Sequence, residues 1–306
     1  MTAFDVQDVY ARFGTRQVLR EVNLAIGPGL WLVSGRNGSG KSTLLGLLAG
    51  EGAPVRGQVT FGGKPTRQPS VRTRIAYLRS VLDLDPRVSC RQQLDLRLGL
   101  AGLRPGARRS ALTPLIERFA LGAFIDRPPV TLSQGQRQSV ALVGTLALPA
   151  DALLLDEPLR GLDTARQAAL LDLLAERSLQ QPVVVVSHEG HRLTGRGAHA
   201  LLMWQGRVLT EAASRVWLAE SAARRFWVRL EGPEMRALAG AMAAAPGIGA
   251  LWLREDVLRI ECAEIDQVLA ALEAAPAALG GAVRAFAHGA MALDDIVAQT
   301  PREGWL

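Results

Sequence analysis

The chain is poor in cysteine and lysine, and it has no long apolar run. Its two cysteines, Cys90 and Cys262, lie far apart in the sequence, which excludes a disulfide framework or a cysteine-rich metal cluster. No apolar run approaches the ~20 residues that a membrane-spanning helix needs. The first residues also lack the basic-then-apolar order of a signal peptide. We therefore expect a cytoplasmic protein, with room for about two domains in its 306 residues.

Basic residues are in excess, but they are not concentrated in one place. The net charge of +6 and the pI near 10.2 would permit binding to nucleic acid or to an anionic membrane surface. The basic residues, nearly all arginines, are spread along the chain, and no run of five or six like charges occurs. We therefore expect no nucleic-acid partner, and we favour a membrane-associated partner.

Lys41, one of only two lysines, lies in the stretch around which the chain is organised. Residues 35–43 read G-R-N-G-S-G-K-S-T and fit the phosphate-binding pattern G-x-x-x-x-G-K-[ST]. Apolar residues 30–33 before it predict a strand, and residues 44–49 after it predict a helix, as the pattern requires. Its glycines let backbone N–H groups converge on phosphate, while Lys41 supplies charge and Ser42 a hydroxyl for Mg²⁺. A glycine turn without a ligand is the alternative, and the rarity of lysine argues against it.

Two unbroken apolar runs end in polar residues. Residues 152–155 precede Asp156 and Glu157, and residues 182–186 precede Ser187 and His188. Such runs are typical of parallel strands buried on both faces, and helices between them give an α/β fold with ligands at the carboxyl ends of the strands. Asp156 can then hold Mg²⁺, and Glu157 can orient the attacking water. Acids that merely cap a strand end are the alternative.

Taken in order, these segments resemble the nucleotide-binding subunit of ABC transporters. Residues 35–43 resemble the Walker A loop, and residues 132–136, L-S-Q-G-Q, resemble the LSGGQ-type signature. Residues 153–157 resemble Walker B with its following glutamate, and residues 161–163 resemble the D-loop. The resemblance covers roughly residues 4–210. It implies an α/β P-loop NTPase core with antiparallel β and helical subdomains.

The resemblance also implies ATP and Mg²⁺ as ligands, and it assigns roles to individual residues. The catalytic residues are Glu157, Lys41 and the switch histidine His188. The Mg²⁺ ligands are Ser42 and Asp156. The nucleotide-binding residues are Phe13, which stacks on adenine, and Gly35, Arg36, Asn37, Gly38, Ser39, Gly40, Lys41, Ser42, Thr43, Ser133, Gly135, Gln136 and Asp163.

In this family two such domains close head to tail over ATP. Ser133 and Gly135 would then contact the γ-phosphate that is bound by the other subunit. Because this chain holds one such module, we expect a homodimer. We also expect a separate integral membrane permease as partner, and a location on the inner face of the cell membrane.

Two positions depart from the family pattern. Gln134 replaces the first signature glycine, at a position that tolerates change. Ser80 stands where the family has the Q-loop glutamine, which helps to hold Mg²⁺ and couples the site to the membrane partner. The shorter Ser80 predicts slower or differently coupled hydrolysis.

We expect an ATP-binding domain over residues 1–215, with its helical subdomain at about 88–148, and a C-terminal α+β domain over 216–306. The C-terminal pattern predicts the order β-α-β-β-α-β, which resembles a small ferredoxin-like unit with a role in regulation or subunit contact. Residues 292–297, A-L-D-D-I-V, resemble the LEDVF-type ending of exporter ATPases.

The leading hypothesis is therefore an ATPase subunit that drives export through a separate permease. Two alternatives stay open. One is a soluble ABC ATPase that acts on nucleic acid or ribosomes, and the other is a nucleotide-binding regulatory subunit that hydrolyses ATP weakly.

Overall fold

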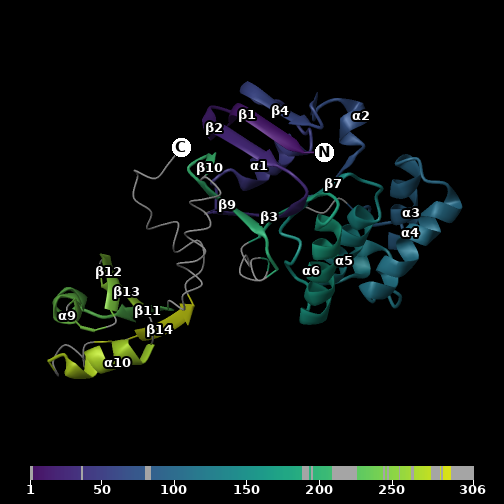
Figure 1. The fold of residues 1–306 in the computed structure, drawn as a ribbon. Helices are drawn as coiled ribbons and strands as arrows, with labels where there is room; N and C mark the ends of the chain where they lie inside the picture. The colour runs from purple at the N-terminus through teal and green to yellow at the C-terminus, as the bar shows by residue number, and fades with distance from the viewer. Residues whose placement is uncertain are drawn as a thin grey trace. The chain divides into compact units, whose positions relative to one another are not determined.

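The computed structural model divides into two compact units (Figure 1). The described residues up to Val208 belong to the first unit, and those from Phe226 to Ala290 belong to the second. No helix in the described part of the chain is long and apolar enough to cross a membrane. The structure describes residues 3–35, 37–79, 84–187, 193, 196–208, 226–243, 245–246, 248–254, 256–262, 265–276, 283 and 285–290.

A six-stranded sheet forms the centre of the first unit. All neighbouring strands are parallel except β9 and β10, which pair antiparallel. Because parallel strands bring their carboxyl ends to one edge, the polar residues that follow them are gathered there. In spatial order the strands are β10 (Arg207–Val208), β9 (His199–Trp204), β3 (Gly29–Gly35), β8 (Pro182–Val186), β7 (Ala152–Asp156) and β6 (Ile75–Leu78).

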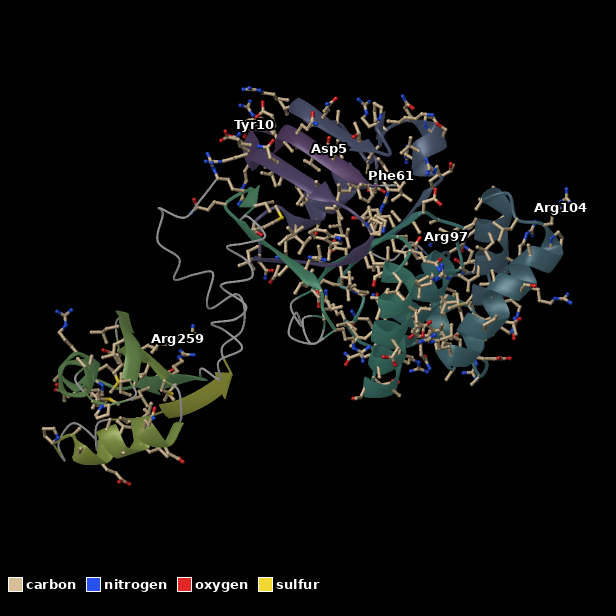
Figure 2. All side chains as sticks on the ribbon, viewed as in Figure 1. Asp5, Tyr10, Phe61, Arg97, Arg104 and Arg259 are labelled. Atoms are coloured by element: carbon tan, nitrogen blue, oxygen red, sulfur yellow. The ribbon has the colours of Figure 1, made fainter. Side chains whose placement is uncertain are left out.

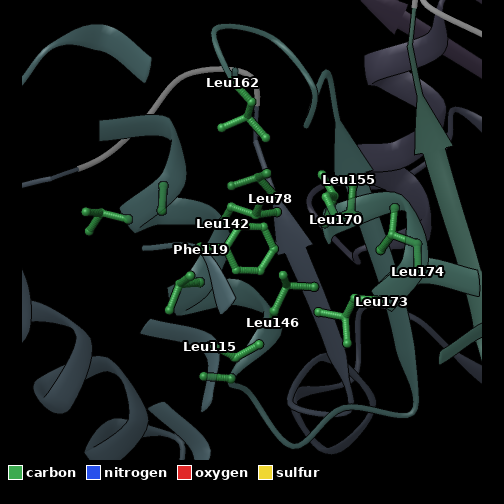
Figure 3. Close-up of a cluster of buried hydrophobic side chains, with 14 of the residues drawn as sticks. Leu78, Leu115, Phe119, Leu142, Leu146, Leu155, Leu162, Leu170, Leu173 and Leu174 are labelled. Carbon is green, nitrogen blue, oxygen red and sulfur yellow. The ribbon is translucent and has the colours of Figure 1, made fainter. Parts of the chain in front are cut away.

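Alternate residues of the central strands pack on opposite faces of this sheet. In β7, Leu153 and Leu155 join a cluster with the helices of one face, whereas Ala152 and Leu154 join the cluster on the other. Figure 3 shows Leu155 among leucines of this first cluster and Phe119. Burial on both faces explains the unbroken apolar runs in the sequence. The first face carries α3 (Cys90–Leu100), α4 (Pro105–Arg118), α5 (Gln134–Leu146) and α6 (Thr164–Ser178).

The other face is covered by α1 (Lys41–Leu48) and by a four-stranded antiparallel sheet. Phe61 of that sheet, labelled in Figure 2, packs against Phe4 with ring centroids 4.6 Å apart. Residues 4–24 alternate between apolar and polar, which is typical of strands, and β1 and β2 pair antiparallel with their turn at residues 14–15. In spatial order the strands are β2 (Arg16–Ile26), β1 (Phe4–Phe13), β4 (Arg56–Phe61) and β5 (Lys64–Pro65).

The helical insert follows the leucine spacing of the sequence. Helix α3 ends at Leu100 and α4 begins at Pro105, so the break between them falls at residues 101–104. Proline suits the first turn of a helix because its missing N–H has no intrahelical partner there. Two short helices, α2 (Pro69–Arg72) and the 3-10 helix η1 (Pro129–Thr131), also begin with proline.

The second unit has the predicted order β-α-β-β-α-β and its own apolar core, which includes Val228, Leu258 and Met242. Its strands are antiparallel, in the spatial order β12-β13-β11-β14. Its assignment to the ferredoxin-like class stays a prediction. The elements are β11 (Phe226–Glu231), α9 (Met235–Met242), β12 (Ile248–Arg254), β13 (Val257–Cys262), α10 (Ile265–Ala274) and β14 (Ala285–Ala290).

Candidate active site

The loop between β3 and α1 depends on glycines that no other residue could replace without strain. Gly35, Gly38 and Gly40 have φ angles of 144°, 80° and 107°. A Cβ added to Gly35 would lie 2.1 Å from the carbonyl oxygen of Met203, and one added to Gly40 would lie 2.7 Å from Leu19 Cδ2. Neighbouring strands thus fix the loop in a shape that leaves its backbone uncovered.

The loop presents hydrogen-bond donors and no acid. Helix α1 has no acidic residue in its first turn, and its N-cap, Gly40, has no side chain to accept the N–H groups there. The first N–H groups of a helix have no intrahelical partner, so they favour an anion. Lys41 is buried, and its Nζ donates to the carbonyl oxygen of Gly35 at 2.5 Å. Within the described residues, the buried Ser39 Oγ has no hydrogen-bond partner. This donor set fits a polyphosphate.

A cavity of about 440 Å³ opens over this loop. The phosphate loop lines this cavity together with Asp156 and Glu157 at the end of β7. The loop and the two acids are more than 100 residues apart in the sequence. The sequence predicted this meeting from the common direction of the strands. The lining residues are Arg16, Val18, Asn37, Gly38, Gly40, Lys41, Ser42, Thr43, Asp156, Glu157 and Val186.

Asp156 and Glu157 are held in different ways. Asp156 ends β7, is 2% exposed, and lines the cavity together with Ser42. Glu157 has a φ of 51°, a strained value for a residue with a side chain. Its N–H donates to the carbonyl oxygen of Val186 at 2.9 Å, and its own carbonyl oxygen accepts from Gln138 Nε2 at 3.3 Å. These bonds hold the backbone of Glu157 in place at the end of β7.

The oxygen atoms of Ser42 and Asp156 suit Mg²⁺, which prefers oxygen ligands and keeps several waters. Within the described residues, no group of three or more histidine, cysteine, aspartate or glutamate side chains could hold a metal ion. The site therefore fits a Mg²⁺ ion that takes its remaining ligands from water and from a phosphate.

The sequence and the fold match the same group of known proteins. The family model described as ABC transporter matches residues 19–160. The zinc import ATP-binding protein ZnuC of Yersinia enterocolitica is 32% identical over 207 residues, which make up 67% of this chain and 77% of ZnuC. The chain belongs to the ABC transporter ATP-binding family. As an ABC ATPase it binds ATP with Mg²⁺ and hydrolyses ATP.

Solved structures agree with this assignment. The structure of an ATP-binding subunit of an ABC transporter matches with a TM-score of 0.64 and 25% identity, covering 68% of this chain and 89% of that one. The dimeric structure of a bacterial ABC transporter cassette matches with a TM-score of 0.61 and 24% identity, covering 67% of this chain and 96% of that one. Both establish the α/β P-loop fold of this ABC ATPase.

The signature segment of this ABC ATPase begins α5. Ser133 Oγ accepts from the N–H of Gln136 at 3.2 Å, and Gln136 Oε1 accepts from the N–H of Ser133 at 2.9 Å. A Cβ added to Gly135 would lie 2.1 Å from the carbonyl oxygen of Gly161 in the D-loop segment. Asp163 caps α6 by accepting from the N–H of Arg166 at 2.8 Å. None of Ser133, Gly135, Gln136 and Asp163 lines the 440 Å³ cavity.

Four of the predicted positions cannot be placed in full. Arg36, Ser80 and His188 lie outside the described residues, as does the side chain of Phe13. Their roles in stacking, Mg²⁺ binding and γ-phosphate contact stay predictions. The described part of the site therefore consists of the phosphate loop and the two acids.

Sequence reasoning did not name three residues of the cavity, Arg16, Val18 and Val186. Val186 ends the second apolar run, so its position was implied by the strand that precedes His188. Arg16 and Val18 belong to β2 in the antiparallel sheet. They reach the cavity because that sheet packs over the loop. Their position in the sequence, just after Phe13, is the only feature that could have predicted it.

Tyr77, near the end of β6, interacts electrostatically with Asp156 of the site. Burial raises the pKa of Tyr77 above its ordinary value, and the nearby carboxylates of Asp156 and Glu51 raise the pKa further. Tyr77 therefore keeps its proton at neutral pH. Arg79 Nε donates to Glu51 Oε1 at 2.9 Å, which anchors the chain immediately before Ser80 to the turn that follows α1.

Proposed function

We propose that this ABC ATPase drives the movement of a substrate through a separate membrane permease, and that two copies close head to tail over ATP. One observation carries the proposal. The phosphate loop and the acids after β7 line one cavity, while Ser133 and Gly135 lie outside it in the same chain. Because the family signature has to reach the nucleotide, a second copy is the natural source of these residues.

Lys41 and the phosphate loop do the binding. Lys41 Nζ already points along the loop, since it donates to the carbonyl oxygen of Gly35. It exchanges this acceptor for phosphate oxygens, which carry more negative charge. Mg²⁺, when it is bound between Ser42 and Asp156, supplies positive charge that stabilises the phosphate oxygens.

Glu157 positions the attacking water. Its backbone is hydrogen-bonded to Val186 and to Gln138, and the residue lines the cavity. A carboxylate there accepts a hydrogen bond from the water and directs the oxygen toward the terminal phosphate. Because Gln138 lies on α5, the helix that begins with the signature, the position of Glu157 also depends on that helix.

Ser133 and Gly135 complete the site in a dimer. Both lie in the first turn of α5 or at its cap, where backbone N–H groups favour an anion. In a head-to-tail pair they donate to the terminal phosphate that is held by the other copy. ATP then adds contacts between the copies, and hydrolysis removes them.

A groove between α3 and α4 supports the permease as partner. This groove has a volume of about 590 Å³ and includes Leu96 and Leu100, which are 61% and 82% exposed. Arg109 also lines it, and Arg104 projects outward nearby (Figure 2). Apolar side chains this exposed are typical of a surface that another protein covers. This arrangement favours a peripheral location at the inner face of the membrane.

Transport direction is a separate part of the proposal. The ending at residues 292–297, which lies outside the described residues, favours export, whereas ZnuC is named as an import protein. We propose export from the ending alone. In inside-out vesicles that contain the permease, ATP-dependent uptake of its substrate supports export, and ATP-dependent release contradicts it.

The experiment that tests the catalytic part compares wild type with Glu157→Gln. The amide keeps the shape of the side chain but accepts a proton poorly, so we expect ATP binding to persist while hydrolysis falls by roughly 100-fold or more. Rapid hydrolysis at equal rates by both proteins would show that Glu157 is not the catalytic carboxylate. Hydrolysis near background in both proteins would favour the weakly hydrolysing regulatory subunit instead.

A further inference from the structure

Arg16 is a cavity residue to which neither the sequence motifs nor the proposed mechanism gives a role. It is the first residue of β2 and the Cα partner of Phe13 across the β1–β2 hairpin. It lines the same cavity as Lys41, Asp156 and Glu157. The antiparallel sheet therefore supplies a cation to a site whose other charged groups come from the central sheet and α1.

The guanidinium of Arg16 reaches the phosphate loop itself. A Cβ added to Gly38 would lie 3.7 Å from Arg16 Nη2, in ordinary van der Waals contact. Gly38 lies in the middle of the loop, between Gly35 and Lys41, where the backbone is open to a ligand. An arginine at this distance is close enough to share an anion with the N–H groups of the loop.

No carboxylate neutralises this arginine within the described part of the chain. Arg16 is exposed and takes part in none of the ion pairs there. Arginines elsewhere in the first unit are paired with acids, as Arg79 is with Glu51 and Arg166 is with Asp163. Asp156 and Glu157 line the same cavity, but among the described residues no ion pair joins either of them to Arg16, and the proposed mechanism uses Asp156 for Mg²⁺ and Glu157 for the attacking water.

We propose that Arg16 binds the phosphate chain of the nucleotide, as a second cation beside Lys41. A planar guanidinium forms two charge-assisted hydrogen bonds to one phosphate. These bonds contribute more binding free energy when the arginine has no ion pair to give up. Nucleotide binding thereby joins the antiparallel sheet to the phosphate loop. The proposal rests on the nucleotide site proposed above.

The test is a set of equilibrium titrations with ATP and with GTP. Arg16→Gln should weaken the binding of both nucleotides by roughly tenfold, because two charge-assisted bonds are lost. Arg16→Lys should recover most of this affinity, since it restores the charge. Arg20→Gln is the matched control, because Arg20 is exposed on the same strand and does not line the cavity. It should bind both nucleotides like wild type.

The comparison of nucleotides separates a phosphate contact from an effect on the base. Equal losses for ATP and GTP support the proposal, because the two share their phosphates and differ in the base. Wild-type affinity in Arg16→Gln, or a loss for ATP without a loss for GTP, would overturn it. If the nucleotide site itself were wrongly assigned, wild-type protein would bind no ATP, which distinguishes that error from a wrong role for Arg16.

Discussion

The first turn of α5 and the turn before α6 meet through two glycines, Gly135 and Gly161. A Cβ on Gly135 would approach the carbonyl oxygen of Gly161 to 2.1 Å, and Gly161 itself has a φ of 75°. The signature segment and the D-loop segment are therefore packed backbone to backbone. A change in one of these segments moves the other.

Gly135→Ala should separate the two segments and lower the ATPase rate. Because the obstructing atom is a backbone oxygen, the clash cannot be relieved by a side-chain rotation. We expect a loss of roughly tenfold or more, since a small displacement of a phosphate-binding helix end impairs catalysis. Gly106→Ala is a matched control, because Gly106 is also the second residue of its helix and has no atom within 4 Å of its added Cβ. Full activity of Gly135→Ala would contradict the contact.

Lys41→Ala should weaken ATP binding, because the phosphates lose a buried positive partner. Charge-assisted hydrogen bonds of this kind predict a loss of roughly 10- to 100-fold in affinity. The other lysine of the chain, Lys64, is exposed on β5, so Lys64→Ala serves as the control. A nucleotide titration that finds Lys41→Ala equal to Lys64→Ala would refute the role of Lys41.

Gly144→Ala should destabilise the first unit even though alanine favours a helix. A Cβ on Gly144 would lie 2.5 Å from Leu94 Cδ2, and Leu94 is only 2% exposed, so its side chain would have to shift within a packed core. Overpacking costs about 1–3 kcal/mol, which exceeds the gain of about 1 kcal/mol in helix propensity. The same change at Gly240, in α9 with no atom within 4 Å, should not destabilise its own unit. Thermal unfolding of the two variants measures the difference.

The buried Cys90 should make stability depend on alkaline pH. Burial raises the pKa of the Cys90 thiol, so the folded protein holds this proton more tightly than the unfolded chain. The resulting stability is complete below the ordinary thiol pKa, and it is lost as the pH rises through the raised pKa. Cys90→Ala should therefore lose less unfolding free energy than wild type between pH 7 and pH 10. Identical pH slopes in urea unfolding would show that Cys90 does not contribute.

The sequence predicted those parts of the site that depend on residues close together in the chain. Residues 152–155 and 182–186 are apolar without alternation because they are buried on both faces of the sheet, and the phosphate loop carries its own pattern. The serine and glutamine three positions apart at Ser133 and Gln136 could also have predicted the capping box that begins α5.

The remaining features arise from contacts between distant segments. Arg16 joins the cavity only because the antiparallel sheet packs over α1, and no spacing in the sequence reports that distance. The contact of Gly135 with Gly161 joins the first turn of α5 to the loop that precedes α6. The sequence contains a glycine in each segment, but it does not predict that the two glycines are in contact.

Head-to-tail closure of two copies is tested most directly by mixing two inactive variants, Lys41→Ala and Ser133→Arg. Each homodimer lacks one half of both sites, so neither should hydrolyse ATP. A mixed dimer regains one intact site, formed by the phosphate loop of the Ser133→Arg copy and the signature of the Lys41→Ala copy. With equal amounts, half of the dimers are mixed, so activity should rise to at most roughly a quarter of wild type. Activity that stays at the level of the separate variants would contradict a site shared between two copies.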